Sequence, residues 1–133
     1  MARMELDLFM ASHSKKDWSP GSVDCLLTLA DWFVWRGFPD PASHLRGTYF
    51  DEAGFRDKVS EAGGTVEIVG SCALPIGLKR IETPQIGSIG IIGSVTNTNR
   101  QFGGIFDGKQ WHVRFCGGFQ PMIAKPLATW GGF

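Results

Sequence analysis

The chain has 133 residues, of which 43% are hydrophobic and 12% aromatic, and its 13 basic and 13 acidic side chains give a formal charge of zero. This length and composition predict one domain with its own core over residues 1–133. The balanced charge argues against nucleic-acid binding through a basic surface. Charges or glycines interrupt every apolar stretch before about 18 residues, so no membrane span is expected. The N-terminal segment lacks the pattern of a secretory leader, which predicts a protein made in a cytoplasm without a leader of its own.

Three cysteines, Cys25, Cys72 and Cys116, are spread along the chain. Their number is odd, so at least one thiol stays outside any internal disulfide. No cysteines and histidines have the spacing of a zinc site, and no phosphate-binding glycine loop occurs. We therefore expect neither a metal nor a cofactor, and we expect Cys72 and Cys116 to be ordinary buried or reduced thiols.

Helical patterns fill the first half of the chain. Leu6, Phe9 and Met10 have the spacing of a short amphipathic helix that ends near Ser14. Further helices are predicted over residues 23–36, 51–62 and 65–74.

Local signals set the expected ends of these helices. Ser22 or Asp24 can cap the helix over 23–36, and Gly37 fits the left-handed position after its end. Gly63-Gly64 closes the third predicted helix, and Pro75 is expected to stop the fourth.

Strand patterns fill the second half. Strands are predicted over residues 86–95, 101–108, 109–115 and 120–124, followed by a terminal turn around Trp130. The pair Asp107-Gly108 is a strong hairpin signal. Helices followed by strands predict an α+β fold, and the short connections between strands predict an antiparallel sheet.

Cys25 follows Asp24 at the predicted start of the longest helix. A thiol there would feel the positive end of the helix dipole, which lowers its pKa and favours the thiolate. Free N–H groups of the first helical turn could also hold an oxyanion. A cysteine at a helix start, with a sheet that can supply a histidine, is typical of thiol enzymes, although an apolar-helix cysteine is more often a core residue.

The stretch Trp18-x-x-Gly21-x-x-Asp24-Cys25 resembles the nucleophile segment of NlpC-type, papain-like cysteine peptidases, in which an Asp-Cys pair opens the helix. Further features resemble a phage branch of that superfamily, made up of short proteins encoded in tail gene clusters. These features are Ala30-Asp31-Trp32, Asp40-Pro41, Arg46-Gly47-x-Tyr49, Gly63-Gly64, Gln85 to Ile89, Phe115 to Phe119, and Ala128-x-Trp130. The resemblance covers nearly the whole chain. It implies a papain-like (NlpC-type) fold with N-terminal helices packed on a C-terminal antiparallel sheet.

The chain departs from this family at the catalytic histidine. The stretch from Asn99 to Ile105 stands where the family's strand begins with histidine, and it contains none. His112 falls near the family's third polar position, so it is either a relocated base, an orienting group, or an ordinary strand residue. The resemblance therefore implies Cys25 and His112 as catalytic residues and Asp24 and Gln101 as oxyanion or orienting groups. His13 and His44 are expected on the solvated surface.

Three functions are compatible with these features. The resemblance implies a phage tail-tip protein that cleaves amide bonds of peptidoglycan stem peptides through an acyl-thioester on Cys25. The alternative is an inactive NlpC-like structural component of the tail that binds hub and distal tail proteins. A third is a protein or glycan binder unrelated to phage, because some of the five tryptophans could line a glycan or partner surface rather than the core. Under the first two the protein belongs to the virion.

Overall fold

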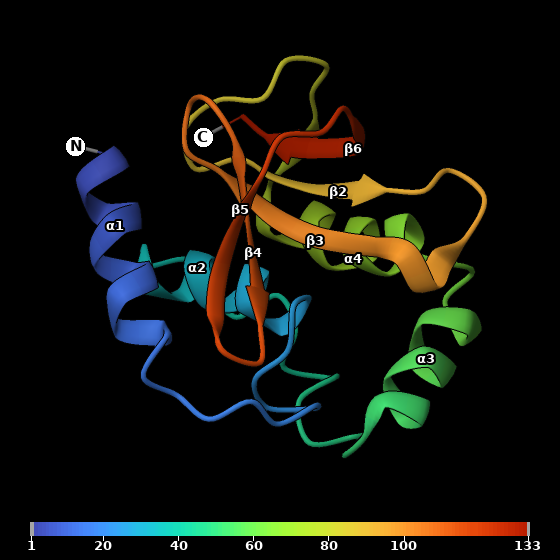
Figure 1. Cartoon of the computed structure of the whole chain (residues 1–133). Coiled ribbons are helices and arrows are strands. Elements are labelled where there is room, and N and C mark those ends of the chain that lie inside the picture. The colour runs from blue at the N-terminus through green and yellow to red at the C-terminus, as the bar shows by residue number, and fades with distance from the viewer. Residues whose placement is uncertain (1, 133) are drawn as a thin grey trace.

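The computed structural model describes residues 2–132 (Figure 1). Its helices are α1 (Ala2–His13), α2 (Leu27–Trp35), α3 (Glu52–Glu61), α4 (Thr65–Ala73) and the 3₁₀ turns η1 (Leu74–Ile76) and η2 (Thr98–Arg100). Its strands are β1 (Lys79–Arg80), β2 (Ile89–Gly93), β3 (Gln101–Phe106), β4 (Trp111–Phe115), β5 (Gly118–Met122) and β6 (Pro126–Gly131). The four α-helices precede the sheet along the chain, so the predicted α+β class is confirmed.

The strands form one antiparallel sheet in the order β1-β6-β2-β3-β4-β5. The antiparallel arrangement and the hairpin at Asp107-Gly108 are therefore confirmed, and Gly108 has a positive φ of 106°. Figure 1 shows β4 and β5 turned steeply against β2 and β3, so the sheet is strongly twisted. Helices α2 and α4 lie along one side of β2 and β3.

The expected terminal turn around Trp130 is wrong. Residues 126–131 form β6, which inserts between β1 and β2 and places Trp130 opposite Ile89 and Arg80. The strand begins with Pro126 and ends with Gly131. Both residue types disfavour a strand interior, so the sequence pattern did not indicate a strand here.

The predicted start of the second helix at residue 23 is also wrong. Helix α2 begins at Leu27, and before it Val23 pairs with Ser19 in a tight turn. The Oδ1 atom of Asp24 accepts the N–H groups of Leu26 and Leu27 at 3.1 and 2.9 Å. Asp24 therefore caps the N-terminal end of this helical segment, as expected of one of the two predicted capping residues, and its carbonyl oxygen accepts the N–H of Thr28 at 3.0 Å.

The other helices agree with the sequence patterns to within about one residue. Asp51 caps α3, and its Oδ1 accepts the N–H of Gly54 at 2.7 Å. Pro75 does not end the helical path after α4, because it lies inside η1, and the chain leaves at Gly77 with a φ of 90°.

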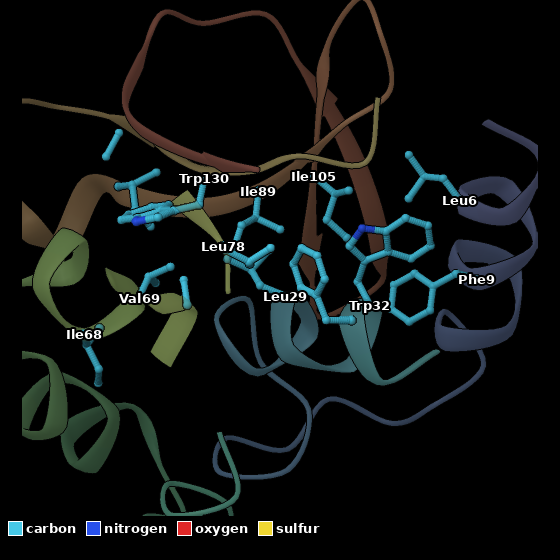
Figure 2. Close-up of a cluster of buried hydrophobic side chains, with 14 of the residues drawn as sticks. Leu6, Phe9, Leu29, Trp32, Ile68, Val69, Leu78, Ile89, Ile105 and Trp130 are labelled. Carbon is cyan, nitrogen blue, oxygen red and sulfur yellow. The ribbon is translucent and has the colours of Figure 1, made fainter. Parts of the chain in front are cut away.

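One large apolar cluster lies between the helices and the sheet. Figure 2 shows Phe9 and Trp32 beside Ile105 at one end of this cluster and Trp130 near Val69 at the other. A separate cluster of Ile92, Trp111 and Val113 lies on the opposite side of the sheet, because alternate strand residues face opposite ways. Three of the five tryptophans, Trp32, Trp111 and Trp130, are therefore core residues.

His13 contradicts its expected place on the surface. It is only 2% exposed, and its Nε2 lies 2.8 Å from Oδ2 of Asp31. Arg114 donates from Nε to Nδ1 of His13 at 3.3 Å, so the His13 proton is on Nε2 and is donated to Asp31. The C-terminal end of α1 is thus tied to both α2 and β4. His44 is exposed, as expected.

Candidate functional site

A cleft of about 400 Å³ opens beside Cys25. Its walls come from the turn before α2, from α3, from the start of α4, and from β3 and β4. Its lining residues include Trp18, Asp24, Cys25, Glu52, Arg56, Thr65, Gln101, Phe102, Arg114 and Phe115. The cleft thus gathers three of the four site residues expected from the sequence: Asp24, Cys25 and Gln101.

Asp24 is the organising residue of the turn that presents Cys25. Besides the two N–H groups before α2, its Oδ2 accepts the N–H of Gly21 at 3.0 Å and the hydroxyl of Tyr49 at 2.6 Å. Burial, together with the charge of Asp24, holds the pKa of Tyr49 well above its usual range, so Tyr49 remains a donor. With four donors bound, the buried Asp24 carboxylate stabilises this turn rather than orienting a catalytic base.

Cys25 is a half-buried residue that packs against the cluster of Ile92, Trp111 and Val113. Burial raises its pKa to about 12, because the opposing hydrogen bond with the Gly103 backbone is outweighed. The negative charges of Asp24 and Glu52 add to the rise.

The expectation of a lowered Cys25 pKa at a helix start is therefore wrong. The helix begins two residues later than Cys25, at Leu27. The N–H groups of Leu26 and Leu27, which could have stabilised a thiolate or an oxyanion, are bound by Asp24. The turn geometry thus removes both effects that the sequence suggested.

His112 is not among the residues that line the cleft. It lies on β4 between Trp111 and Val113 and therefore faces the opposite side of the sheet from the cluster that contacts Cys25. Its Nε2 donates to Oδ2 of Asp107 at 2.7 Å. Within residues 2–132 no histidine hydrogen-bonds to Cys25, so the structure does not bring the two expected catalytic residues together.

Gln101 reaches the cleft, but both ends of its amide are engaged. Its Oε1 accepts the Thr65 hydroxyl at 2.8 Å, and its Nε2 donates to the Ser94 carbonyl at 2.8 Å. Gln101 therefore ties β3 to the start of α4 and to the loop after β2. One N–H of its amide is thereby held by the Ser94 carbonyl, and the amide oxygen is held by the Thr65 hydroxyl.

Arg114 was missed by the sequence reasoning, although it lines the cleft and is only 1% exposed. Its guanidinium donates to His13 Nδ1, to the Lys16 carbonyl at 2.6 Å and to the Phe115 carbonyl. Burial lowers its pKa from the usual value. The buried cation thus joins α1 to β4 on the inner side of the cleft.

A sequence signal for buried His13 did exist. Leu6, Phe9 and Met10 continue to His13 at the i, i+3, i+4, i+7 spacing of one helix face. His13 therefore belongs to the buried stripe of α1, and its polar nitrogens require partners inside the protein.

Comparison of the chain with protein-family models, with curated proteins and with solved structures finds no match. In the described part of the chain, no group of three or more His, Cys, Asp or Glu side chains is placed to hold a metal ion. None of the helices within residues 2–132 combines the length and hydropathy that crossing a membrane requires.

Proposed function

We propose that this protein is a non-hydrolytic component of a phage tail tip, with a papain-like (NlpC-type) fold whose cleft binds a partner instead of cleaving a substrate. The observation that supports this most is the state of Cys25. Its pKa is raised to about 12, and no histidine among the described residues is bonded to it. The tail location and the proposed partners, hub and distal tail proteins, follow from the sequence resemblance.

A thiol peptidase needs two things that this cleft does not provide. The attacking group must be a thiolate, and at neutral pH a thiol with a pKa near 12 is almost entirely protonated. An acid must also protonate the leaving amine, usually the imidazole that took the thiol proton. In the cleft, the buried cation of Arg114 and the bound amide of Gln101 cannot replace that imidazole.

A cysteine peptidase acting on peptidoglycan stem peptides remains the second candidate. One observation favours it: Cys25 lines a cleft large enough for a peptide segment. In that case Cys25 would form the acyl-thioester, and a histidine would have to come from outside residues 2–132 of this chain.

Digestion of purified peptidoglycan distinguishes the two candidates. The wild-type protein and the Cys25→Ser variant are incubated with cell walls, and released stem peptides are measured by mass spectrometry, with an active cysteine peptidase as positive control. We expect no release by either protein. Release by the wild type that is lost in Cys25→Ser would contradict the proposal.

The location in the tail is tested separately. Mass spectrometry of purified virions of the phage that carries this gene should detect the chain in stoichiometric amounts with the tail proteins. Co-expression with the hub protein of the same gene cluster should give a complex that survives size-exclusion chromatography. Absence from the virions would remove the tail assignment.

A further inference from the structure

A second thiol, outside the cleft, lies against a histidine. Cys72 is on the last turn of α4, and its Sγ lies 3.9 Å from Nε2 of His44, in the segment between α2 and α3. It is the one thiol–imidazole contact recorded in residues 2–132. Cys72 and His44 are 28 residues apart in the chain, so no local sequence signal indicates their contact.

The segment that carries His44 is held in place although His44 itself is exposed. Asp40 accepts the N–H of Ala42 at 3.0 Å and two bonds from Arg46, at 2.8 and 3.2 Å. These bonds clamp both ends of the turn around His44. The imidazole is therefore presented to α4 by a fixed loop and not by a freely moving one.

Cys72 also lines a small apolar pocket. The pocket has a volume of about 40 Å³ and is walled by residues that include Ala42, Leu45 and Val69. One water molecule needs roughly 10–15 Å³ measured in this way, so the pocket has room for a group of a few heavy atoms. The half-buried thiol is thus reachable by a small, uncharged molecule.

The chemistry of Cys72 requires a base. Burial raises the pKa of Cys72 despite the opposing effect of a hydrogen bond with Ser71, and the negative charge of Asp40 adds to the rise. The charged groups that face this corner are Asp40 with its partner Arg46, and Lys58, which lines the pocket. Without a proton acceptor the thiol would be a poor nucleophile, and an imidazole is the acceptor that proteins most often use near neutral pH.

We propose that Cys72 and His44 form a modification site for small uncharged α,β-unsaturated carbonyl compounds. His44 Nε2 takes the thiol proton while the sulfur adds to the β-carbon of the electrophile. A C–S bond forms, the carbon–carbon π bond breaks to give an enolate, and His44 returns the proton to the α-carbon. This inference is independent of the proposed tail function.

The other two cysteines serve as internal controls. Cys25 has no imidazole partner among the described residues and is strongly disfavoured as a thiolate. Cys116 is exposed in the turn between β4 and β5, so it reacts by simple access to solvent. The specific feature of Cys72 is therefore its dependence on His44.

The test uses acrylamide as the electrophile, with the modification rate of each cysteine measured by peptide mass spectrometry in one sample. In His44→Gln, the Cys72 rate at pH 7 should fall by roughly tenfold or more. The Cys116 rate should not change, and His112→Gln should leave both rates as in the wild type. An unchanged Cys72 rate in His44→Gln would overturn the proposal.

A second measurement needs only the wild-type protein. As the pH falls from about 8.5 to about 7, an exposed thiol without a base loses reactivity, whereas a base-assisted Cys72 should lose less. The ratio of the Cys72 rate to the Cys116 rate should therefore rise. A constant ratio, or a Cys72 that stays unmodified while Cys116 reacts to completion, would refute the assignment.

Discussion

Gly21 lies in the turn that presents Cys25 to the cleft, and its backbone has a φ of 89°. A Cβ at this position would lie 1.9 Å from the carbonyl oxygen of Tyr49. We expect Gly21→Ala to lower the free energy of unfolding by more than about 3 kcal/mol, because a left-handed strain of about 1–2 kcal/mol is added to a backbone clash. Chemical denaturation of the wild type and the variant measures this loss.

Gly37 provides the matched control. Its φ is 93°, close to that of Gly21, but a Cβ there would meet nothing within 4 Å. Gly37→Ala should therefore show only the conformational strain, about 1–2 kcal/mol. Equal losses of unfolding free energy in the two variants would mean that the turn can move away from Tyr49. The turn that presents Cys25 would then not be rigid.

At the scale of single elements, the loop between β3 and β4 depends on one carboxylate. Asp107 Oδ1 accepts the N–H groups of Lys109 and Gln110, and Oδ2 accepts from His112 and lies 3.3 Å from Arg3 of α1. Burial alone would raise the pKa of Asp107, but the hydrogen bonds from His112 and the loop backbone outweigh it and lower the pKa to about 2.

This lowered pKa predicts an acid-dependent loss of stability. The Asp107 carboxylate has a lower pKa in the folded protein than in the unfolded chain, where it is about 4. It therefore stabilises the folded protein at pH values above about 4, and this stabilisation is lost as the pH falls from about 4 to about 2. In urea unfolding, the wild type should exceed Asp107→Asn in stability at pH 5, and this gap should shrink by about 2 kcal/mol at pH 2. A gap that stays constant would contradict the account.

Strand β6 was not expected from the sequence, although it contributes buried residues to the core. Trp130, near the end of β6, is 1% exposed, whereas Trp35 at the end of α2 is 47% exposed. Trp130→Ala should cost about 3–5 kcal/mol, and Trp35→Ala about 1 kcal/mol or less, as measured by thermal or chemical unfolding. If both variants lost the same stability, β6 would not be a core strand.

At the scale of the whole molecule, regular patterns predicted the elements that depend on local chemistry. The helices α1, α3 and α4 and the β3–β4 hairpin follow from apolar spacing, from the closing pair Gly63-Gly64 and from Asp107-Gly108. Strand β6 could not be predicted in this way, because its partners β1 and β2 lie far from it in the chain. The start of α2 was placed too early because Val23, which continues the apolar helical pattern, instead pairs with Ser19 in a turn ahead of the capping residue Asp24.

Three of the four expected site residues line one cleft, but their contacts could not be predicted from the sequence. The Asp24-Cys25 pair does lie in one cleft with Gln101, as the motif suggested. The protonation state of Cys25 depends on its burial against the cluster of Ile92, Trp111 and Val113, which the tertiary fold brings to it. The direction in which a strand histidine faces depends on register, and a shift of one residue would have turned His112 to the other side.

The central claim is that the Cys25 thiol is protonated and has no base of its own. It is tested most directly by the pH dependence of iodoacetamide alkylation of Cys25 in a Cys72→Ser/Cys116→Ser variant, followed from about pH 5 to about pH 11. A thiol with a pKa of about 12 predicts a rate that keeps rising over the whole range, without a plateau. A rate that levels off below about pH 7 would reveal a thiolate–imidazolium pair and would contradict a binding function without catalysis.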